Sequence, residues 1–308
     1  YMTLPKGDSV QGGRGRGMIM GGFHPAVQTM EYVSIQSQGN SIAFGDMSTP
    51  TQGWGSALAS STRACIAGGG YPSNIDTIEF VTIAVTSNTT DFGNLTAAKV
   101  NTGTCSSQVR GLIAGGNSTP VFFNNIDFIT IASTGDAQDF GDLTQIRMEL
   151  AGASSPTRGL FMGGANPGVV NRSNVVDFVT IATAGNAQDF GDLTQNTYKG
   201  GAGTSNNTRA IHAGGNEPSF VTDIEFFTIA TTGNGTDFGD LTDARGYQAS
   251  LSNSVRGLNA GGYDGSSALN TIDFVIIATT GNAKDFGDLL SINYGTSGSS
   301  DSHGGLSE

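Results

Sequence analysis

An all-β fold in which six blades surround a central axis, a β-propeller, is predicted by three features of this 308-residue sequence. The motif Arg-x-x-x-x-Gly-Gly occurs six times, with spacings of 47, 47, 48, 51 and 47 residues between successive arginines. A run rich in β-branched and aromatic residues follows each motif, and a run of small residues precedes it. Self-similarity at a period of about 40 to 50 residues is typical of propeller blades. The repeat arginines are Arg16, Arg63, Arg110, Arg158, Arg209 and Arg256.

Each repeat contains four short segments with the composition of β-strands, separated by Gly, Asn and Asp residues typical of turns. The first begins at the repeat arginine, the second is an apolar run with one acid, such as IDFITI over 126–131, and the third contains Asp-Phe-Gly in most repeats. The fourth comes just before the next arginine, and 34 of the 48 residues in its six copies are Gly, Ala, Ser, Thr or Cys. Because blades crowd together near the axis, these small residues predict the innermost strand.

Residues 14–308 are predicted to form a single domain that the C-terminal segment closes. The first repeat starts directly at its arginine-led strand, and residues 1–13 match the small-residue pattern poorly, whereas YGTSGSSD over 294–301 matches it well. An open ring would expose a sheet edge, so we expect the segment 292–303 to supply the inner strand of the first blade. Since the chain begins at Tyr1, residues 1–13 are interpreted as a lead-in from an upstream segment.

The order of these features resembles the kelch repeat, as at Gly115-Gly116, Asp127, Phe140 and Arg147. The sequence departs from that repeat by carrying Phe where Trp is usual and by lacking the Tyr-Asp that ends the third strand. The resemblance covers nearly the whole chain. It implies a kelch-type β-propeller with four antiparallel strands per blade, and it implies little about function.

A narrower resemblance concerns the consensus TI[DE]FVTIATTGNAxDFGDLT and the sequence SDSHGGL over 300–306. Both resemble the kelch-like repeats of tail and fibre proteins of marine bacteriophages. The resemblance implies a virion protein on a tail fibre or appendage, with a host-surface glycan or protein receptor, or other virion proteins, as partner. The alternatives are a decoration or scaffold protein of the virion and a secreted, extracellular kelch lectin or enzyme. Fibres are often trimers, and a trimer would form through regions outside this chain.

Composition argues against several partners. Acidic residues outnumber basic ones by 26 to 14, a net charge of −12, so the chain should repel nucleic acid and anionic membranes. No run of 18 apolar residues is present, so we expect no membrane insertion. The two cysteines, Cys65 and Cys105, do not make a disulfide framework. Two buried thiols are favoured over a bridge between them.

Three recurring polar groups are interpreted as structural. The repeat arginines could form an anion-binding ring, but one per blade favours ties to a carboxylate or carbonyl of the next blade. An acid within each apolar run is costly unless it accepts hydrogen bonds, and we expect the Gly-Gly amides to donate them. The aspartates of Asp-Phe-Gly-Asp could chelate Ca²⁺, yet only two recur per site, so turn bonding is favoured over a metal. The six acids are Glu31, Glu79, Asp127, Asp177, Glu225 and Asp273.

No catalytic site and no cofactor are predicted. The histidines, His24, His212 and His303, fall in three different repeats, which offers neither a Ser-His-Asp trio nor a copper site. Asp-Phe-Gly recurs five times without the other kinase motifs, so a kinase is excluded.

The segments after each Gly-Gly vary in length and content, and loops on a rigid scaffold commonly carry binding function. Several hold aromatic side chains beside Asn, Asp or Arg, a combination that suits sugar stacking or protein recognition. The alternative is that the rings fold back over the blade ends. The candidate ligand-binding residues are Phe23, His24, Tyr71, Phe122, Phe123, Asn171, Arg172, Phe220, Tyr263 and Asp264.

Overall fold

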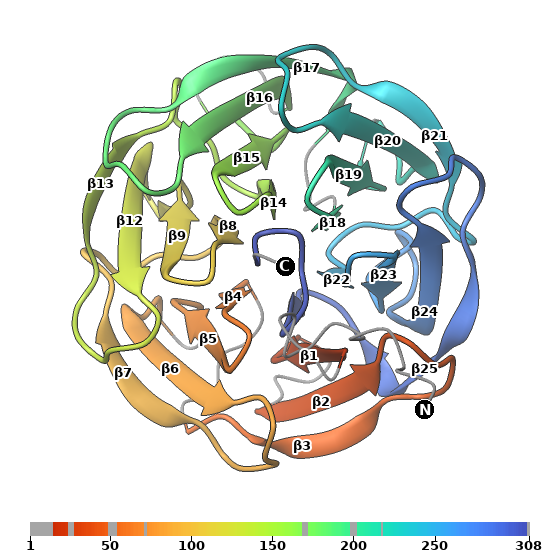
Figure 1. Ribbon diagram of the computed structural model, residues 1–308, viewed down its shortest axis with the longest axis horizontal. Coiled ribbons are helices and arrows are strands. Elements are labelled where there is room, and N and C mark those ends of the chain that lie inside the picture. Colours follow the sequence, from red (N-terminus) through yellow and green to blue (C-terminus); the bar gives the residue numbers. More distant parts are fainter. Residues whose placement is uncertain are drawn as a thin grey trace, which may run out of the picture.

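The chain forms a ring of six four-stranded antiparallel sheets, so the predicted six-bladed β-propeller is confirmed (Figure 1). A computed structural model describes residues 15–23, 28–48, 54–70, 73–167, 172–197, 202–216 and 218–306. The blades radiate from a central channel, and the C-terminal end of the chain lies at its centre (Figure 1).

The first two strands of each blade are those that the repeat predicts. Inner strands are four residues long and nearly free of large side chains. They are β26 (Ser297–Ser300), β4 (Ser56–Ala59), β8 (Gly103–Ser106), β14 (Ala151–Ser154), β18 (Ala202–Ser205) and β22 (Ala249–Ser252). Second strands begin at the repeat arginine: β1 (Arg16–Met20), β5 (Arg63–Ala67), β9 (Arg110–Ala114), β15 (Arg158–Met162), β19 (Arg209–Ala213) and β23 (Arg256–Ala260).

The apolar runs form the third strands and the Asp-Phe-Gly motifs the outer strands. The third strands are β2 (Thr29–Ser34), β6 (Thr77–Thr82), β12 (Asn125–Thr130), β16 (Ser173–Thr180), β20 (Asp223–Thr228) and β24 (Leu269–Ile276). The outer strands are β3 (Ile42–Asp46), β7 (Thr90–Asn94), β13 (Gln138–Asp142), β17 (Gln188–Thr197), β21 (Thr236–Asp240) and β25 (Lys284–Asn293). A small hairpin, β10 (Asn117–Ser118) and β11 (Val121–Phe122), follows the second strand of the third blade.

The C-terminal strand closes the ring as predicted. Strand β26 pairs antiparallel with β1, with Gly17 opposite Ser300 and Met20 opposite Ser297, so the first blade has the order β26-β1-β2-β3. Beyond the strand, Asp301 accepts a hydrogen bond from the backbone N–H of Arg16 at 3.0 Å. Both ends of the described chain therefore meet within one blade.

The hydrophobic core lies between blades rather than within one layer. One cluster joins Leu58 and Ile78 of the second blade to Ile113 and Ile129 of the third, and similar clusters fill other wedges. The two cysteines are free and buried in different clusters, which confirms the prediction of two thiols. Burial raises the pKa of Cys65 to about 12, so its thiol stays protonated and inert.

The repeat arginines tie neighbouring blades together, which confirms the structural interpretation. Arg63 donates from Nη1 to the carbonyl oxygen of Ile131 in the next blade at 3.1 Å. Its guanidinium also lies 4.5 Å from the ring centroid of Phe80 in its own blade. All six arginines make equivalent bonds to the next blade and stack on an aromatic ring of their own. We call the side of the ring that carries them the arginine face, and the opposite side the loop face.

The third-strand acids also join blades, but the predicted donors are wrong. Asp177 accepts hydrogen bonds from the backbone N–H and the hydroxyl of Thr144, which follows the outer strand of the preceding blade. The Gly-Gly amides instead donate to backbone carbonyls, as Gly116 does to Arg147. The amides were expected to bond the acid because they are close in sequence. The ring instead brings the preceding blade nearer. The residue just after the outer-strand motif of that blade donates to the acid, a Ser or Thr at five junctions and the backbone N–H of Leu290 at Glu31.

The blade junctions fall into two chemical types that the acids distinguish. Where the acid is Asp, a fully buried cation from the preceding linker pairs with it, at 3.1 Å for Lys99–Asp127 and 2.6 Å for Arg147–Asp177 and Arg245–Asp273. Each of these cations stands four positions after the Leu that ends the Asp-Phe-Gly-Asp/Asn-Leu sequence of the preceding blade. Where the acid is Glu, the same position of the preceding blade holds a neutral residue, which is Thr51, Thr197 or Asn293. Glu31 and Glu79 then bond a hydroxyl at the start of their own outer strand, Ser41 and Thr89, where the Asp blades have alanine. At these two junctions a hydroxyl of the same blade therefore donates to the acid where an Asp junction has a buried cation.

Glu225 should make stability depend on pH, because its junction has Thr197 in place of a cation. Burial, opposed by hydrogen bonds from Thr194, raises the pKa of Glu225 to about 6 from its usual 4.5. The folded state therefore binds the proton more tightly than the unfolded state, and this stabilisation is lost as pH rises through 6. Between pH 4.5 and 6.5, the free energy of unfolding of the parent should fall relative to that of Glu225→Gln, which lacks the titrating carboxyl. Urea unfolding of both proteins at several pH values measures this difference. A difference in unfolding free energy that does not change with pH would contradict this assignment.

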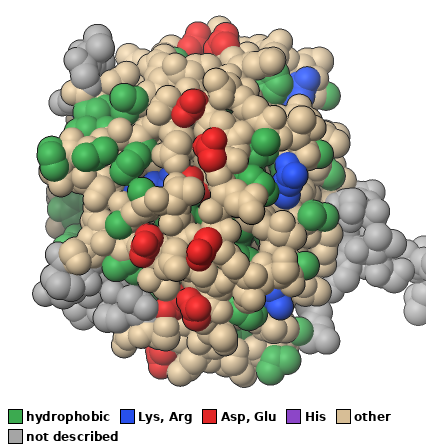
Figure 2. All heavy atoms as spheres, turned by 90° about the vertical axis from the view of Figure 1, so that its left-hand side faces the viewer, with side chains coloured by type: hydrophobic (Ala, Val, Ile, Leu, Met, Phe, Trp, Pro, Cys, Tyr) green, Lys and Arg blue, Asp and Glu red, His purple; other side chains and the backbone are tan. Residues whose placement is uncertain are grey.

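The outer rim of the ring is acidic. Carboxylates are scattered over the side of the molecule in Figure 2, and the aspartates of the outer strands, such as Asp91, Asp139 and Asp237, are exposed. Charged groups on an edge strand oppose edge-to-edge association. Among the residues that the structure describes, there is no apolar helix of membrane-spanning length.

Candidate functional site

The predicted ligand-binding residues that the structure describes lie in segments on the loop face, and they divide into two groups. His24, Tyr71 and Asn171 lie outside the described residues. Phe23, Phe220 and Tyr263 converge near the mouth of the channel. Phe122, Phe123, Arg172 and Asp264 make local contacts instead.

Those local contacts are structural in character. The ring of Phe123 lies 5.7 Å from the ammonium of Lys99, which it covers, and Phe122 belongs to the short strand β11. Arg172 donates to Asn216 Oδ1 at 3.2 Å and so bridges the loops of the fourth and fifth blades. Asp264 accepts from the backbone N–H groups of Ser267 and Ser266, and these bonds lower its pKa.

Six aromatic side chains form one connected group over the channel mouth, which we call the aromatic cluster. Ring centroids are 4.6 Å apart for Trp54–Tyr247 and 5.3 Å for both Phe23–Tyr294 and Tyr263–Tyr294. Phe220 joins through Tyr263 at 5.8 Å. The members come from the loops and inner-strand starts of the fifth, sixth, first and second blades. They are Phe23, Trp54, Phe220, Tyr247, Tyr263 and Tyr294.

Three of the six members of the aromatic cluster are not among the ligand-binding residues predicted from the sequence. Trp54, Tyr247 and Tyr294 do not belong to the variable loops but stand just before small-residue strands. A signal was present, because a single tryptophan and two tyrosines border segments otherwise built of Gly, Ala, Ser and Thr. Large rings next to strands that crowd an axis can point only out of the channel end.

An unusual backbone conformation places two of these rings. Trp54, Asn101, Glu149 and Tyr247 have φ between 59° and 63°, and they are the only non-glycine residues with positive φ in the described chain. Each lies two positions before the first residue of an inner strand. Their amides bond around the mouth: Asn101 N–H donates to the Trp54 carbonyl at 2.9 Å, and Glu149 N–H to the Asn101 carbonyl at 2.7 Å. Such conformations cost about 1 to 3 kcal/mol each and persist because surrounding bonds impose them.

A second ring of hydrogen bonds lies at the far end of the inner strands. The hydroxyls of five serines each donate to the carbonyl of the equivalent residue in the preceding blade, at 2.5 to 2.9 Å. They are Ser106, Ser154, Ser205, Ser252 and Ser300. The C-terminal residues after β26 cross this ring, and Gly304 N–H donates to the carbonyl of Ser205 at 3.1 Å. The channel is therefore closed on the arginine face.

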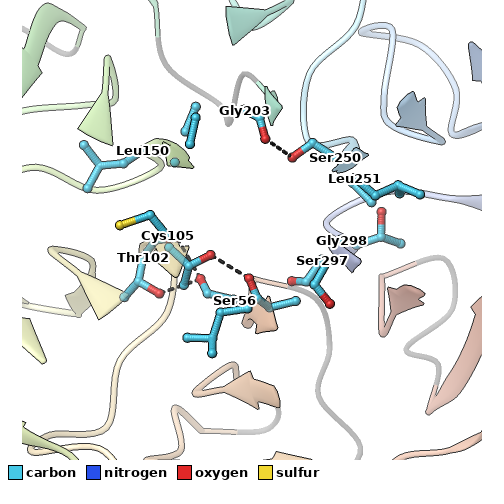
Figure 3. Close-up of a pocket in the computed structure, with 18 of the residues that line it drawn as sticks. Ser56, Thr102, Cys105, Leu150, Gly203, Ser250, Leu251, Ser297 and Gly298 are labelled. Atoms are coloured by element: carbon cyan, nitrogen blue, oxygen red, sulfur yellow. Dashed lines mark hydrogen bonds between the residues drawn. The ribbon is translucent and has the colours of Figure 1, made fainter. Parts of the chain in front are cut away.

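Between the two rings lies a cavity of about 160 Å³ (Figure 3). Inner strands of all six blades line it, and in Figure 3 the hydroxyl of Ser250 bonds the carbonyl of Gly203 across two blades, at 2.8 Å. Trp54 and Tyr247 lie at its loop-face end and His303 at its floor. Among the described lining residues, Glu149 is the only one with a formal charge at neutral pH.

Ser106 and His303 contact each other at the floor, 3.2 Å apart, a distance typical of a nucleophile and its base. The hydrogen bonds argue against that role. His303 Nδ1 accepts from the Gly305 amide, so the proton resides on Nε2, which lies 2.8 Å from the carbonyl of Ala59. A protonated Nε2 cannot take the hydroxyl proton of Ser106. Burial also lowers the pKa of His303, which keeps the ring neutral in this structural contact.

Metal removal should leave the fold intact. The described residues contain no group of three or more His, Cys, Asp or Glu side chains that could hold a metal ion. Asn186 Oδ1 of the next blade accepts from the Asp142 backbone N–H at 3.1 Å, so a side-chain bond between blades already fastens this turn. We expect the melting temperature to be unchanged by EDTA. A fall of many degrees that Ca²⁺ reverses would identify the outer strands as an ion-binding ring.

The channel mouth thus combines a cluster of aromatic faces with the amide of Asn101 and the carboxylate of Glu149, above a cavity with polar walls. Such a surface can stack on flat apolar faces and hydrogen-bond to hydroxyl groups. Neither a scan of protein-family models nor a search of curated proteins finds a match to this chain.

Proposed function

We propose that this propeller is a non-enzymatic recognition module of a bacteriophage virion, and that it binds a glycan of the host-cell surface at the mouth of its central channel. The aromatic cluster is the observation that carries the proposal. Pyranose rings present a flat C–H face that stacks on aromatic rings, while their hydroxyls bond to neighbouring amides and carboxylates. Here the rings of Trp54, Tyr247 and Tyr294 lie beside Asn101 and Glu149.

The virion setting rests on the repeat sequence. Its resemblance to the kelch-like repeats of bacteriophage tail and fibre proteins supports a place on a tail fibre or appendage. A rigid ring with one aromatic face and an acidic rim suits a terminal module that contacts an uncharged surface group.

The alternative is a virion decoration protein whose loop face binds other virion proteins. An aromatic cluster also serves protein recognition, since Tyr, Trp and Phe are enriched at interface cores. The two functions differ in what competes for binding. A free polysaccharide inhibits a glycan-binding module and has no effect on a protein–protein contact.

The test uses the labelled full chain with host cells and with their purified surface polysaccharide. We expect saturable binding to the cells that the polysaccharide inhibits, together with the protein's presence in the mass spectrum of purified particles. Binding to virus particles from which this protein has been removed, if the polysaccharide does not inhibit it, would support the function of a decoration protein instead. A protein found only in culture supernatant, and absent from particles, would overturn the virion setting.

A further inference from the structure

Lys99, Asn125 and Asp127 form a compact polar group at the junction of the second and third blades. Asn125 and Asp127 are two positions apart on strand β12, so their side chains lie on the same side of that strand. Lys99 belongs to the linker that follows the outer strand of the second blade. Its backbone is held in that blade, because its N–H donates to the carbonyl of Ile75 and its carbonyl accepts from the N–H of Gly69. The lysine side chain therefore reaches across the junction from a fixed position.

Each of the three side chains contacts the other two. Lys99 Nζ lies 3.1 Å from Asp127 Oδ2 and 3.4 Å from Asn125 Oδ1. Asn125 Nδ2 donates to Asp127 Oδ1 at 2.7 Å. An amine thus lies next to the carbonyl of a carboxamide, while one carboxylate contacts both the amine and the amide nitrogen. The two reacting groups of an acyl transfer and a group able to carry protons between them are already in place.

The amine and the acid are buried away from water. Both side chains are 0% exposed, and the ring of Phe123 lies 5.7 Å from Lys99 Nζ. Burial lowers the pKa of Lys99, although the attraction of Asp127 opposes this shift. A larger share of the amine is then neutral, and a desolvated neutral lysine is an activated nucleophile. Burial also excludes the water that would compete with it for the carboxamide.

This combination of residues occurs at one of the six junctions. The position of Lys99 holds Arg in two other blades and a neutral residue in three, and arginine stays protonated in proteins. The position of Asn125, two before the acid, holds Thr29, Thr77, Val175, Asp223 and Thr271 in the other blades. An amine and a carboxamide therefore coincide only here. An ion pair alone requires neither, since Arg147–Asp177 forms without a carboxamide at this position.

We propose that Lys99 and Asn125 react with each other to form an intramolecular isopeptide bond, with Asp127 as the catalytic residue that carries the protons. Asp127 accepts a proton from the Lys99 ammonium, and the lone pair of Nζ attacks Cγ of Asn125. The new Nζ–Cγ bond forms, and the Cγ–Nδ2 bond then breaks. Nζ gives up two protons in total, and Asp127 passes both to Nδ2, which leaves as ammonium. The reaction needs no oxidant and no co-reactant.

The bond joins the linker of the second blade covalently to the third strand of the third blade. It closes a loop between positions 26 residues apart, and a covalent cross-link of this kind restricts the unfolded chain, as a disulfide does. One junction of the ring then holds without depending on an ion pair. This modification is independent of the proposed function.

Mass spectrometry of the purified full chain tests the proposal. We expect the parent chain to be about 17 Da lighter than its sequence, because one molecule of ammonia is lost. Trypsin does not cleave after an acylated lysine, so residues 64–110 and 111–147 should be recovered as one branched peptide. A parent chain of full mass, with 64–99 and 111–147 as separate peptides, would show that the three side chains form only a structural ion pair and would overturn the proposal.

The chain itself offers matched controls. Lys99→Arg gives this junction the Arg–Asp pair that two other junctions carry, and Asn125→Thr introduces the residue of the sixth blade. Both variants should fold and keep the full mass of their sequences. The same loss of ammonia from either one would place the reaction elsewhere in the chain and contradict the assignment.

The role of Asp127 is tested with Asp127→Ala. The folded variant should keep its full mass, and a loss of ammonia from it would exclude Asp127 as the proton carrier. The parent chain and the two controls decide whether the bond forms even where Asp127→Ala does not fold.

Discussion

Deletion of residues 296–308 is expected to destabilise the whole ring, with aggregation or a fall in melting temperature of more than about 10 °C. The deletion removes β26, the inner strand of the first blade, while leaving the outer strand β25 of the sixth blade complete. Strand β1 would then present an unpaired edge next to the channel. The hydroxyl bonds from Ser297 to Gly55 and from Ser300 to Ser252, which join the first blade to its neighbours, would also be lost.

A circular permutant provides the matched control for this deletion. Residues 294–301, joined through a Ser-Thr turn to Arg16, would restore β26 at the start of the chain and give the first blade the connectivity of the other five. We expect calorimetry to show a single transition near that of the parent for the permutant and a much lower one for the deletion. A truncated chain that melts like the parent would mean that another segment fills the inner position of the first blade.

Replacement of Trp54 with alanine is expected to weaken glycan binding by about 30-fold or more, since loss of a stacked aromatic anchor costs about 2 kcal/mol. The ring of Trp54 lies 4.6 Å from that of Tyr247 and 6.4 Å from that of Phe23, so its removal disrupts the centre of the aromatic cluster. Alanine and tryptophan are similarly strained at the φ of 63° that Trp54 adopts. The substitution therefore removes the ring without changing the conformational strain of the backbone.

Trp54→Phe keeps an aromatic face and should retain most of the affinity, which separates stacking from a general effect on the mouth. Isothermal titration with the polysaccharide that binds the parent chain measures both variants. Equal affinity for the parent and a folded Trp54→Ala variant would remove the aromatic cluster as the binding site.

The fold could be predicted from sequence because each blade repeats the same chemistry. Six arginines, six Gly-Gly pairs and the small-residue segments fixed the strand order and even the closing strand, since YGTSGSSD matches the inner strands of the other blades. Bonds between blades were harder to predict. The acids were expected to bond amides near them in sequence, and the true donors, such as Thr144 for Asp177, belong to the blade before.

The candidate site could be predicted only in part, for a related reason. Phe23, Phe220 and Tyr263 lie in variable loops, where binding residues are expected, and the structure brings them together. Their neighbours Trp54 and Tyr247 are separated by 193 positions and meet only because the ring closes. The pairing of Asp with a buried cation and of Glu with a neutral residue was visible in the sequence, but its meaning depends on which blades are adjacent.

Fluorescence of Trp54 tests the central claim most directly, because this is the only tryptophan in the chain and it lies at the proposed site. Titration with the host-cell surface polysaccharide should give a saturable change in tryptophan emission with the same dissociation constant as calorimetry. A polysaccharide that binds by calorimetry and leaves the emission of Trp54 unchanged would place the ligand elsewhere on the ring and contradict this account.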